Sequence, residues 1–401
     1  MEGHDMASVA SVLPTERPAG SPFDPPAELA ELREQRPLSR LDYPDGHVGW
    51  LVTSHALVRE VLADPRLSIR TELRHLPVPG TPGSDRPAPP GMFTGMDAPE
   101  HTRYRRMLTG QFTVRRMRQL TDRIQEITDQ HLDALVQQAP PVDLVSALAQ
   151  PVPAQVICEL LGVPYADRAR FQEDALALFR LDSAPERVTA AYRSVHEFVS
   201  ELVAAKRAAP TDDLLSGLTT GDLTDEELVN IGFVLLGAGL DTTANMLALG
   251  TFALLSHPDQ LAALRADPGV ADRAVEELLR YLSIIPFTVR TALEDIELGG
   301  ERIRAGEAIT VSLPAANRDA THFADPDVLD LLRPTGGHVA FGHGVHQCLG
   351  QQLARVELRV VFSALLTRFP TLQLACPVED VAIRTDMLIY GVHELPVTWE
   401  A

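Results

Sequence analysis

The stretch "FGHGVHQCLG" (residues 341–350) holds a cysteine among histidines and glycines, directly before a long helical pattern. The segment that follows, "QQLARVELRVVFSALLTRF", carries apolar residues at helical intervals, so Cys348 is expected at a helix N-terminus. Free backbone N–H groups and the helix dipole at such a position stabilise a thiolate. Gly342, Gly344 and Gly350 keep side chains away, which allows a flat ligand to approach the backbone closely.

Three chemistries compete for this cysteine on residue type alone. It could bind zinc together with His338, His343 and His346, act as a nucleophile beside His346, or ligate haem iron as a thiolate. The two-residue spacing of His346 and Cys348 is tighter than the usual zinc pairs, and no second cysteine pair follows. The flanking glycines favour a flat macrocycle over a nucleophile, but the residues by themselves leave all three open.

The loop also carries a family resemblance. Phe341, Gly344, His346, Cys348 and Gly350 match the signature F-x-x-G-x-H-x-C-x-G of the cytochrome P-450 haem-thiolate monooxygenases, a match expected by chance roughly once in 10⁵ chains of this composition. The chain resembles the soluble, actinomycete-type bacterial class with external redox partners, from about residue 25 to its end. The resemblance implies a mainly α fold with a minor β region, in which haem b lies between a long central helix and the helix after the cysteine loop.

The stretch "LLGAGLDTTAN" (235–245) resembles the oxygen-activating groove of the family's central helix. Gly237 and Gly239 weaken a helix, and the Thr242 hydroxyl can bond back to the carbonyl of Ala238, which opens room for O₂ and water. A kinked core helix is the plain structural alternative.

Asp241 stands in an otherwise apolar stretch, where a carboxylate costs energy unless it is paired or conducts protons. The resemblance assigns Asp241 and Thr242 as the catalytic pair: Asp241 passes solvent protons inward and Thr242 delivers them in the O₂ pocket.

"HTRYRRML" (101–108) places two basic side chains, His101 and Arg105, at i and i+4 on one helix face. They could be solvated surface groups, but the resemblance puts them on the haem propionates with Arg290 and His346, an arrangement that suits the arginine fork. It makes Cys348 the iron ligand, and the full expected haem-binding set is His101, Arg105, Ala238, Arg290, Phe341, Gly342, His346, Cys348 and Gly350. It also places Glu277, Arg280 and Arg333 in one buried ion network.

The rest of the chain predicts a mobile tail over residues 1–20 and a single catalytic domain over 21–401. Residues 47–54 predict a strand that feeds a helix, and 289–313 alternate like short strands joined by Gly turns. The spacing of apolar residues over most of 101–285 predicts successive amphipathic helices. Residues 76–100 are so rich in Pro and Gly that they predict a loop, either a linker or a lid over a pocket.

The bulk composition bears on partners and location. A formal net charge of -20 disfavours nucleic acid and anionic membranes. Three scattered cysteines and a start without signal-peptide features predict a cytoplasmic protein. The longest apolar run, residues 231–240, is about half of the roughly 20 residues that span a bilayer.

No Gly-rich dinucleotide fingerprint occurs in a βαβ context, so electrons are expected from a ferredoxin and an NAD(P)H-fed ferredoxin reductase. Between Glu100 and Asp122 there are no acidic residues but a basic island of six arginines, a hypothetical docking surface for an acidic ferredoxin, from which Arg105 is excluded because the haem would occupy it. The six are Arg103, Arg105, Arg106, Arg115, Arg116 and Arg118.

The expected reaction is insertion of one oxygen atom from O₂ into a bulky hydrophobic molecule, by hydroxylation or epoxidation. The substrate is expected to be a secondary metabolite such as a polyketide or macrolide, with the pocket formed by 77–96, 171–197, Ala238, 283–289 and 387–391. A peroxide-using peroxygenase of the same fold and a non-catalytic haem sensor are the alternatives.

Overall fold

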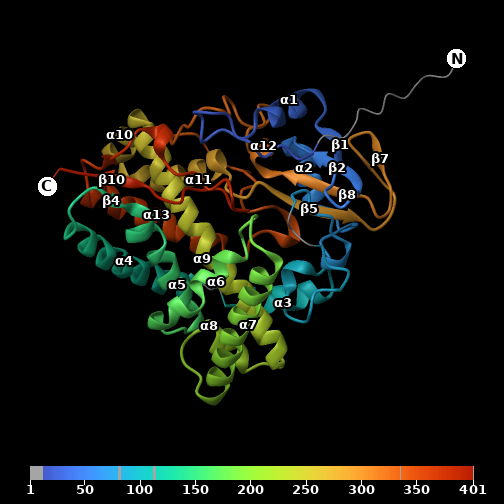
Figure 1. The fold of residues 1–401 in the computed structure, drawn as a ribbon, viewed down its shortest axis with the longest axis horizontal. Coiled ribbons are helices and arrows are strands. Elements are labelled where there is room, and N and C mark those ends of the chain that lie inside the picture. The colour runs from blue at the N-terminus through green and yellow to red at the C-terminus, as the bar shows by residue number, and fades with distance from the viewer. Residues whose placement is uncertain (1–11, 80–82, 112–113, 335, 401) are drawn as a thin grey trace.

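The computed structural model describes residues 12–79, 83–111, 114–334 and 336–400, apart from the side chains of residues 114, 115, 117, 118 and 268 (Figure 1). Helices dominate. They are α1 (Ala27–Gln35), α2 (His55–Ala63), α3 (Glu100–Thr109), α4 (Val114–Val136), α5 (Pro151–Leu161), α6 (Gln172–Ala177), α7 (Pro185–Ala208), α8 (Leu214–Thr219), α9 (Asp225–Ser256), α10 (Pro258–Ala266), α11 (Ala271–Leu282), α12 (Leu313–Asn317) and α13 (Gln351–Arg368).

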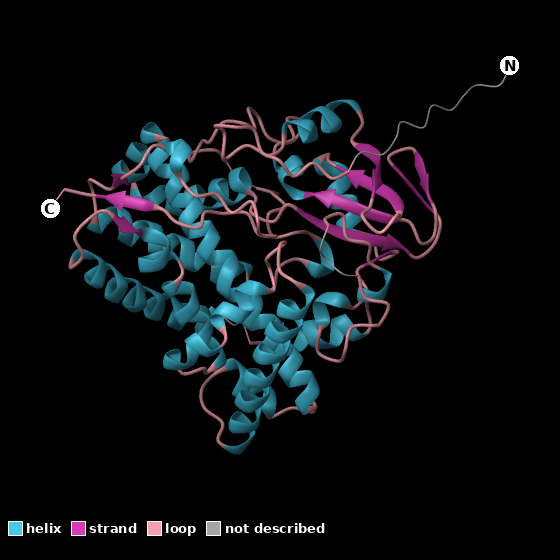
Figure 2. Cartoon of the chain, viewed as in Figure 1, coloured by secondary structure: helices cyan, strands magenta, loops and turns pink. Residues whose placement is uncertain are grey.

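The strands gather mainly at one end of the molecule (Figure 2). They are β1 (Leu38–Asp42), β2 (Val48–Val52), β3 (Leu67–Ser68), β4 (Val142–Asp143), β5 (Phe287–Ala292), β6 (Ile296–Leu298), β7 (Glu301–Ile303), β8 (Ala308–Ser312), β9 (Gln373–Leu374) and β10 (Pro396–Thr398). The main sheet has the order β1-β2-β8-β5-β3, in which β2 and β8 are parallel and the other pairs are antiparallel. Sheet β4-β10-β9 and hairpin β6-β7 are separate hydrogen-bonded units, and the buried side chains of the hairpin pack in one cluster with those of the main sheet.

The predicted mainly α fold with a minor β region is therefore confirmed, and so are several local predictions. Strand β2 feeds helix α2, and strands β5 to β8 occupy the alternating segment. Described parts of the Pro/Gly-rich segment form a loop with one 3₁₀ turn, Phe93–Gly95. Residues 12–20 contain no helix or strand, yet Leu13 is buried and the Arg17 guanidinium lies 3.5 Å from the centre of the Tyr390 ring. The boundary of the tail at residue 20 stays a prediction.

Helix α9 crosses the middle of the fold (Figure 1). It begins with a capping box, in which Thr224 and Glu227 each accept a hydrogen bond from the other's backbone N–H. The helix is long and apolar enough to cross a membrane, but 67% of its most apolar window is buried in the protein, where α5, α7 and α13 pack against it. It is the core helix of a globular protein.

The predicted ion network is also confirmed. Arg280 donates from Nε and Nη2 to the Glu277 carboxylate at 2.8 and 2.7 Å, and Arg333 Nε reaches the same carboxylate at 3.2 Å. Arg280 Nη1 donates to the carbonyls of Asn317 and Pro326, both at 2.8 Å. The network thereby ties helix α11 to the segment that leads into the cysteine loop.

Candidate haem-binding and oxygen-activating site

The cysteine loop is a tight turn ahead of α13. Gly342 N donates to Val339 O at 2.8 Å and Cys348 N to Phe341 O at 2.9 Å, which folds the loop back on itself. Gly342 and Gly344 have φ values of 71° and 74°, in the left-handed region that glycine adopts without strain. A Cβ on Gly344 would also lie 2.4 Å from the carbonyl oxygen of Leu62, so this glycine lets the loop pack on α2.

The side chain of Cys348 is exposed to solvent, although enough protein atoms lie around the thiol to desolvate it partly. It lies three residues before the first residue of α13, close to the predicted helix N-terminus. Burial raises the pKa of the thiol above its ordinary value, while hydrogen bonds from the backbone of Gly350 and Gln351 and the charge of Arg105 act in the opposite direction. The predicted stabilisation of the thiolate is thus present, but in the protein alone it is smaller than the cost of burial.

Basic side chains from separate elements meet around this loop. The rings of His101 (α3) and His346 lie with their centres 4.0 Å apart, and Arg290 on β5 is only 3% exposed. Burial, together with His101 and Arg290, lowers the pKa of His346 to about 3. Burial and the charge of Arg74, opposed by the charge of Asp97, lower the pKa of Arg290 to about 10. The structure thus brings together His101, Arg290 and His346, which the sequence analysis assigned to one site, and adds Arg74, which it did not indicate.

The carboxylate within reach of this cluster is already bound. Asp97 accepts hydrogen bonds from the Ser68 hydroxyl at 2.5 Å and from the backbone of Ile69 at 3.0 Å. Within the described residues, Arg290 Nη1 donates to Val289 O at 2.8 Å and to Thr288 Oγ1 at 3.3 Å, neither of which carries charge. The buried charge of Arg290, with histidine rings beside it, would be stabilised by an anionic ligand.

These residues fit haem, which has two carboxylates and a metal that accepts a thiolate. Arg105 and Arg290 offer charged guanidinium groups for the carboxylates, and His101 and His346 offer ring N–H donors. Arg105 also lies close enough to Cys348 for their charges to interact. A Cβ on Gly342 or Gly350 would meet nothing within 4 Å, so the loop has open space on the sides where these glycines lie. The rival zinc site finds no support, since the described residues contain no group of three or more His, Cys, Asp or Glu side chains that could hold a metal ion.

Thr242 has the hydrogen bond predicted for it. Its Oγ1 donates to Ala238 O at 2.9 Å, four residues back in α9. The helix nevertheless continues without a break from residue 225 to 256. Gly239 has a different role from the one expected, because a Cβ there would lie 2.7 Å from the Ile157 side chain, so this glycine permits close packing of α5 on α9.

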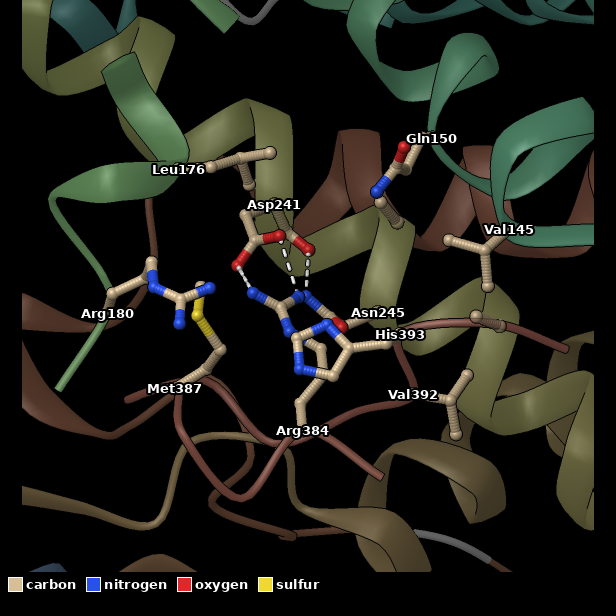
Figure 3. A pocket seen from close by; sticks show the side chains of 12 residues that line it. Val145, Gln150, Leu176, Arg180, Asp241, Asn245, Arg384, Met387, Val392 and His393 are labelled. Atoms are coloured by element: carbon tan, nitrogen blue, oxygen red, sulfur yellow. Dashed lines mark hydrogen bonds and ion pairs between the residues drawn. The ribbon is translucent and has the colours of Figure 1, made fainter. Parts of the chain in front are cut away.

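Asp241 is held by a residue that the sequence did not indicate. Arg384 donates from Nη1 and Nη2 to the two Asp241 carboxylate oxygens at 2.8 and 3.1 Å, and the two side chains are 6% and 2% exposed (Figure 3). The two residues are 143 positions apart, and the one available signal was a lone arginine in the otherwise largely apolar stretch 381–392. Asp241 therefore has the charged partner that its burial was predicted to require.

This fold and this thiolate loop define a haem-thiolate oxygenase, and comparison with known proteins agrees. A family model described as Cytochrome P450 matches residues 269–386. The chain is 50% identical to Cytochrome P450 105C1 of a Streptomyces species over 380 residues, 94% of this chain and 96% of that one. It is 46% identical to pentalenic acid synthase of Streptomyces avermitilis over 383 residues, 94% and 95% of the two chains. The structure of CYP105P1 in complex with filipin I superimposes with a TM-score of 0.93 at 44% identity, covering 98% of this chain and 99% of that one.

The chain belongs to the cytochrome P450 family, with relatives in its 105 group at 45–50% identity over nearly the full length. It is a cytochrome P450 monooxygenase, and haem is its cofactor.

Proposed function

We propose that this enzyme hydroxylates or epoxidises a bulky hydrophobic secondary metabolite of the polyketide or macrolide kind. The observation that carries the proposal is the accessible Cys348 thiol beside two arginines and two histidines, where the carboxylate of Asp97 is already hydrogen-bonded to Ser68. In this proposal Cys348 ligates the iron and His101, Arg105, Arg290 and His346 hold the propionates. Ala238, Phe341, Gly342 and Gly350 contact the macrocycle.

The expected size of the substrate is inferred from a large cavity within the described residues. Its volume is about 910 Å³, enough for a ligand at the upper end of the usual small-molecule range. Val78, Leu181, Phe287, Met387 and Leu388 line it, and all five fall in segments predicted to form the pocket; Leu181 lies in the link between α6 and α7. Filipin I is bound by a solved relative, and a second relative is named for pentalenic acid, which supports a substrate of this class.

Haem supplies the site where O₂ is bound and cleaved with electrons from a redox partner. The protein's part is to bind the substrate, exclude bulk water and supply protons. Thr242 presents its hydroxyl on the helix face that carries Ala238. Asp241, the residue before it in the chain, is the acid that supplies this hydroxyl with protons. The proposed catalytic pair is therefore Asp241 and Thr242.

We infer that a ferredoxin, reduced by an NAD(P)H-fed reductase, docks on the basic island. Within the island Arg106 is exposed, whereas Arg103 is engaged with Glu227 and Arg105 faces Cys348. The side chains of Arg115 and Arg118 lie outside the described residues. The catalytic unit is proposed to be one domain over residues 21–401, working in the cytoplasm.

Thiolate ligation is tested by a carbon monoxide difference spectrum of the reduced protein, wild type beside Cys348→Ser. We expect a strongly red-shifted Soret band in the wild type alone, after which a screen for spin-state shifts with macrolides and terpenoids identifies substrates. Substrate oxidation by Cys348→Ser with normal haem content would refute the assignment.

Docking is tested with Arg106→Glu, and Arg265→Glu on α10 is the control, because Arg265 is also exposed and α10 lies far from α3 (Figure 1). We expect Arg106→Glu to slow reduction by ferredoxin and weaken its salt dependence, because steering by opposite charges is lost. Equal reduction rates in both variants would place the partner elsewhere.

A further inference from the structure

A small polar cavity adjoins the Asp241–Arg384 pair. Its volume is about 120 Å³, room for several waters. Asp241 and Asn245 of α9, Gln150 at the start of α5, and Arg384 and His393 from the C-terminal part of the chain contribute its polar lining (Figure 3). With these partners a water inside it has the hydrogen bonds that a buried water needs.

The segment that carries Arg384 is clamped onto α9. Ile383 pairs with Val392, and Arg384 N donates to Gly391 O at 3.0 Å, which closes a hairpin. A Cβ on Gly391 would lie 2.0 Å from the Asn245 amide oxygen, so only glycine permits this approach. The hairpin thereby fixes the guanidinium against the Asp241 carboxylate.

One hydrogen-bond donor of Arg384 has no partner. Its Nε is buried without a hydrogen-bond partner although Nη1 and Nη2 are paired, and an unpaired buried donor costs free energy that an acceptor recovers. Arg384 also lines the large cavity assigned to the substrate. Arg384 therefore borders both spaces.

Charged groups join the small cavity to solvent. His393 Nε2 lies 2.6 Å from Asp386 Oδ1, and Arg180 Nη2 lies 3.1 Å from Asp386 Oδ2. Their side chains are 28–41% exposed, whereas Asp241 is 2% exposed. The lining thus passes from partly exposed groups to a buried carboxylate.

We propose that this cavity is the inlet through which protons reach Asp241, and that Arg384 is a positioning residue that orients the Asp241 carboxylate and separates the inlet from the substrate cavity. The inference rests on the proposed function. The O₂ reaction, RH + O₂ + NAD(P)H + H⁺ → ROH + H₂O + NAD(P)⁺, needs two protons, one of them from solvent and one released with the electrons of NAD(P)H. Peroxide-driven turnover, RH + H₂O₂ → ROH + H₂O, draws none.

The ion pair itself is tested by thermal unfolding, which needs no substrate. Arg384→Met leaves a buried carboxylate without its partner, so Tm should fall by roughly 5 °C. Adding Asp241→Asn to this variant should recover a large part of that loss, because the buried charge is gone. Additive effects of the two substitutions would show that the pair is not coupled and would overturn the positioning role.

Proton delivery is tested by comparing O₂-driven and peroxide-driven product formation, with filipin I as the first probe and, if it gives no spin-state shift, the strongest responder of the screen. Arg384→Met should lose at least about tenfold in the O₂ reaction while peroxide-driven turnover is kept. Arg384→Lys should recover part of the loss. Ala248→Leu fills the small cavity without changing charge, so it should also reduce the O₂ reaction while peroxide-driven turnover is kept.

Arg123→Met is the matched control, since Arg123 makes a similar two-point contact with Glu159 away from both cavities. It should leave the ratio of the two activities unchanged. Equal losses in both reactions for Arg384→Met would mean a merely structural role and would sink the inference. A wild type without the red-shifted carbon monoxide band would instead refute the proposed function, so the two failures are distinguishable.

Discussion

Two buried arginine–carboxylate pairs in this protein consist of the same chemical groups but differ in their surroundings. Every guanidinium nitrogen of Arg280 donates a hydrogen bond, to Glu277 or to backbone carbonyls, and both side chains are 0% exposed. Arg384 pairs with Asp241 through two nitrogens only, leaves Nε unpaired and borders two cavities. The saturated pair has no room for exchange with water, which suits a structural role, whereas the unsaturated pair can exchange protons with its cavity.

The largest loss of stability is expected from a substitution in the Glu277–Arg280 pair, in which every guanidinium nitrogen is hydrogen-bonded. Glu277→Gln leaves Arg280 and Arg333 buried without a countercharge, so the free energy of unfolding should fall by about 3 kcal/mol or more and haem incorporation should drop. Urea unfolding and the haem-to-protein ratio measure this. A variant as stable as the wild type would mean that the network is not what holds α11 to the cysteine loop.

A third, partly exposed pair on the same helix gives an intermediate effect with a pH signature. Burial would raise the pKa of Glu276, but the hydrogen bond from His338 and the ion pair with Arg355 outweigh it and lower the pKa from 4.5 to about 2. Because the pKa is lowered in the folded state, the stabilisation is fully present above about pH 5 and is lost as pH falls towards 2.

Glu276→Gln should therefore lower Tm at neutral pH and flatten the dependence of Tm on pH between about 5 and 2. The control is Glu297→Gln, at an exposed position on β6, which should follow the wild-type curve. Parallel curves for Glu276→Gln and the wild type would contradict the assigned pKa.

The smallest effect on stability is expected at Thr242. Thr242→Val removes one hydroxyl bond to a backbone carbonyl, so the free energy of unfolding should change by no more than about 1 kcal/mol. O₂-driven product formation should nevertheless fall while peroxide-driven turnover persists. Thr251→Val removes the same kind of bond, from Oγ1 to Leu247 O at 2.8 Å in the same helix, and should leave the two activities in their wild-type ratio. If Thr242→Val and Thr251→Val showed the same ratio of O₂-driven to peroxide-driven activity, Thr242 would have no role in the proton path.

The residues that sequence reasoning placed correctly share one property: their contacts are local or belong to a motif with fixed spacing. The Thr242–Ala238 bond follows from helical geometry, and the cysteine loop returns on itself over a few residues. Gly239 was misread because its partner, Ile157, lies on another helix. The stabilisation of the Cys348 thiolate by backbone N–H groups was predicted, but the opposing effect of burial on the pKa was not visible in sequence.

The amino-acid sequence by itself determined the thiolate loop, the central helix with its Asp–Thr pair and the mainly helical class, because each depends on residue type at short, regular spacing. The tertiary structure alone decided which group pairs with the buried Asp241 carboxylate. Asp241 needed a partner on energetic grounds, but the identity of that partner depended on how closely the Gly391 hairpin approaches α9. Packing sets such contacts between distant segments, and no local pattern encodes them.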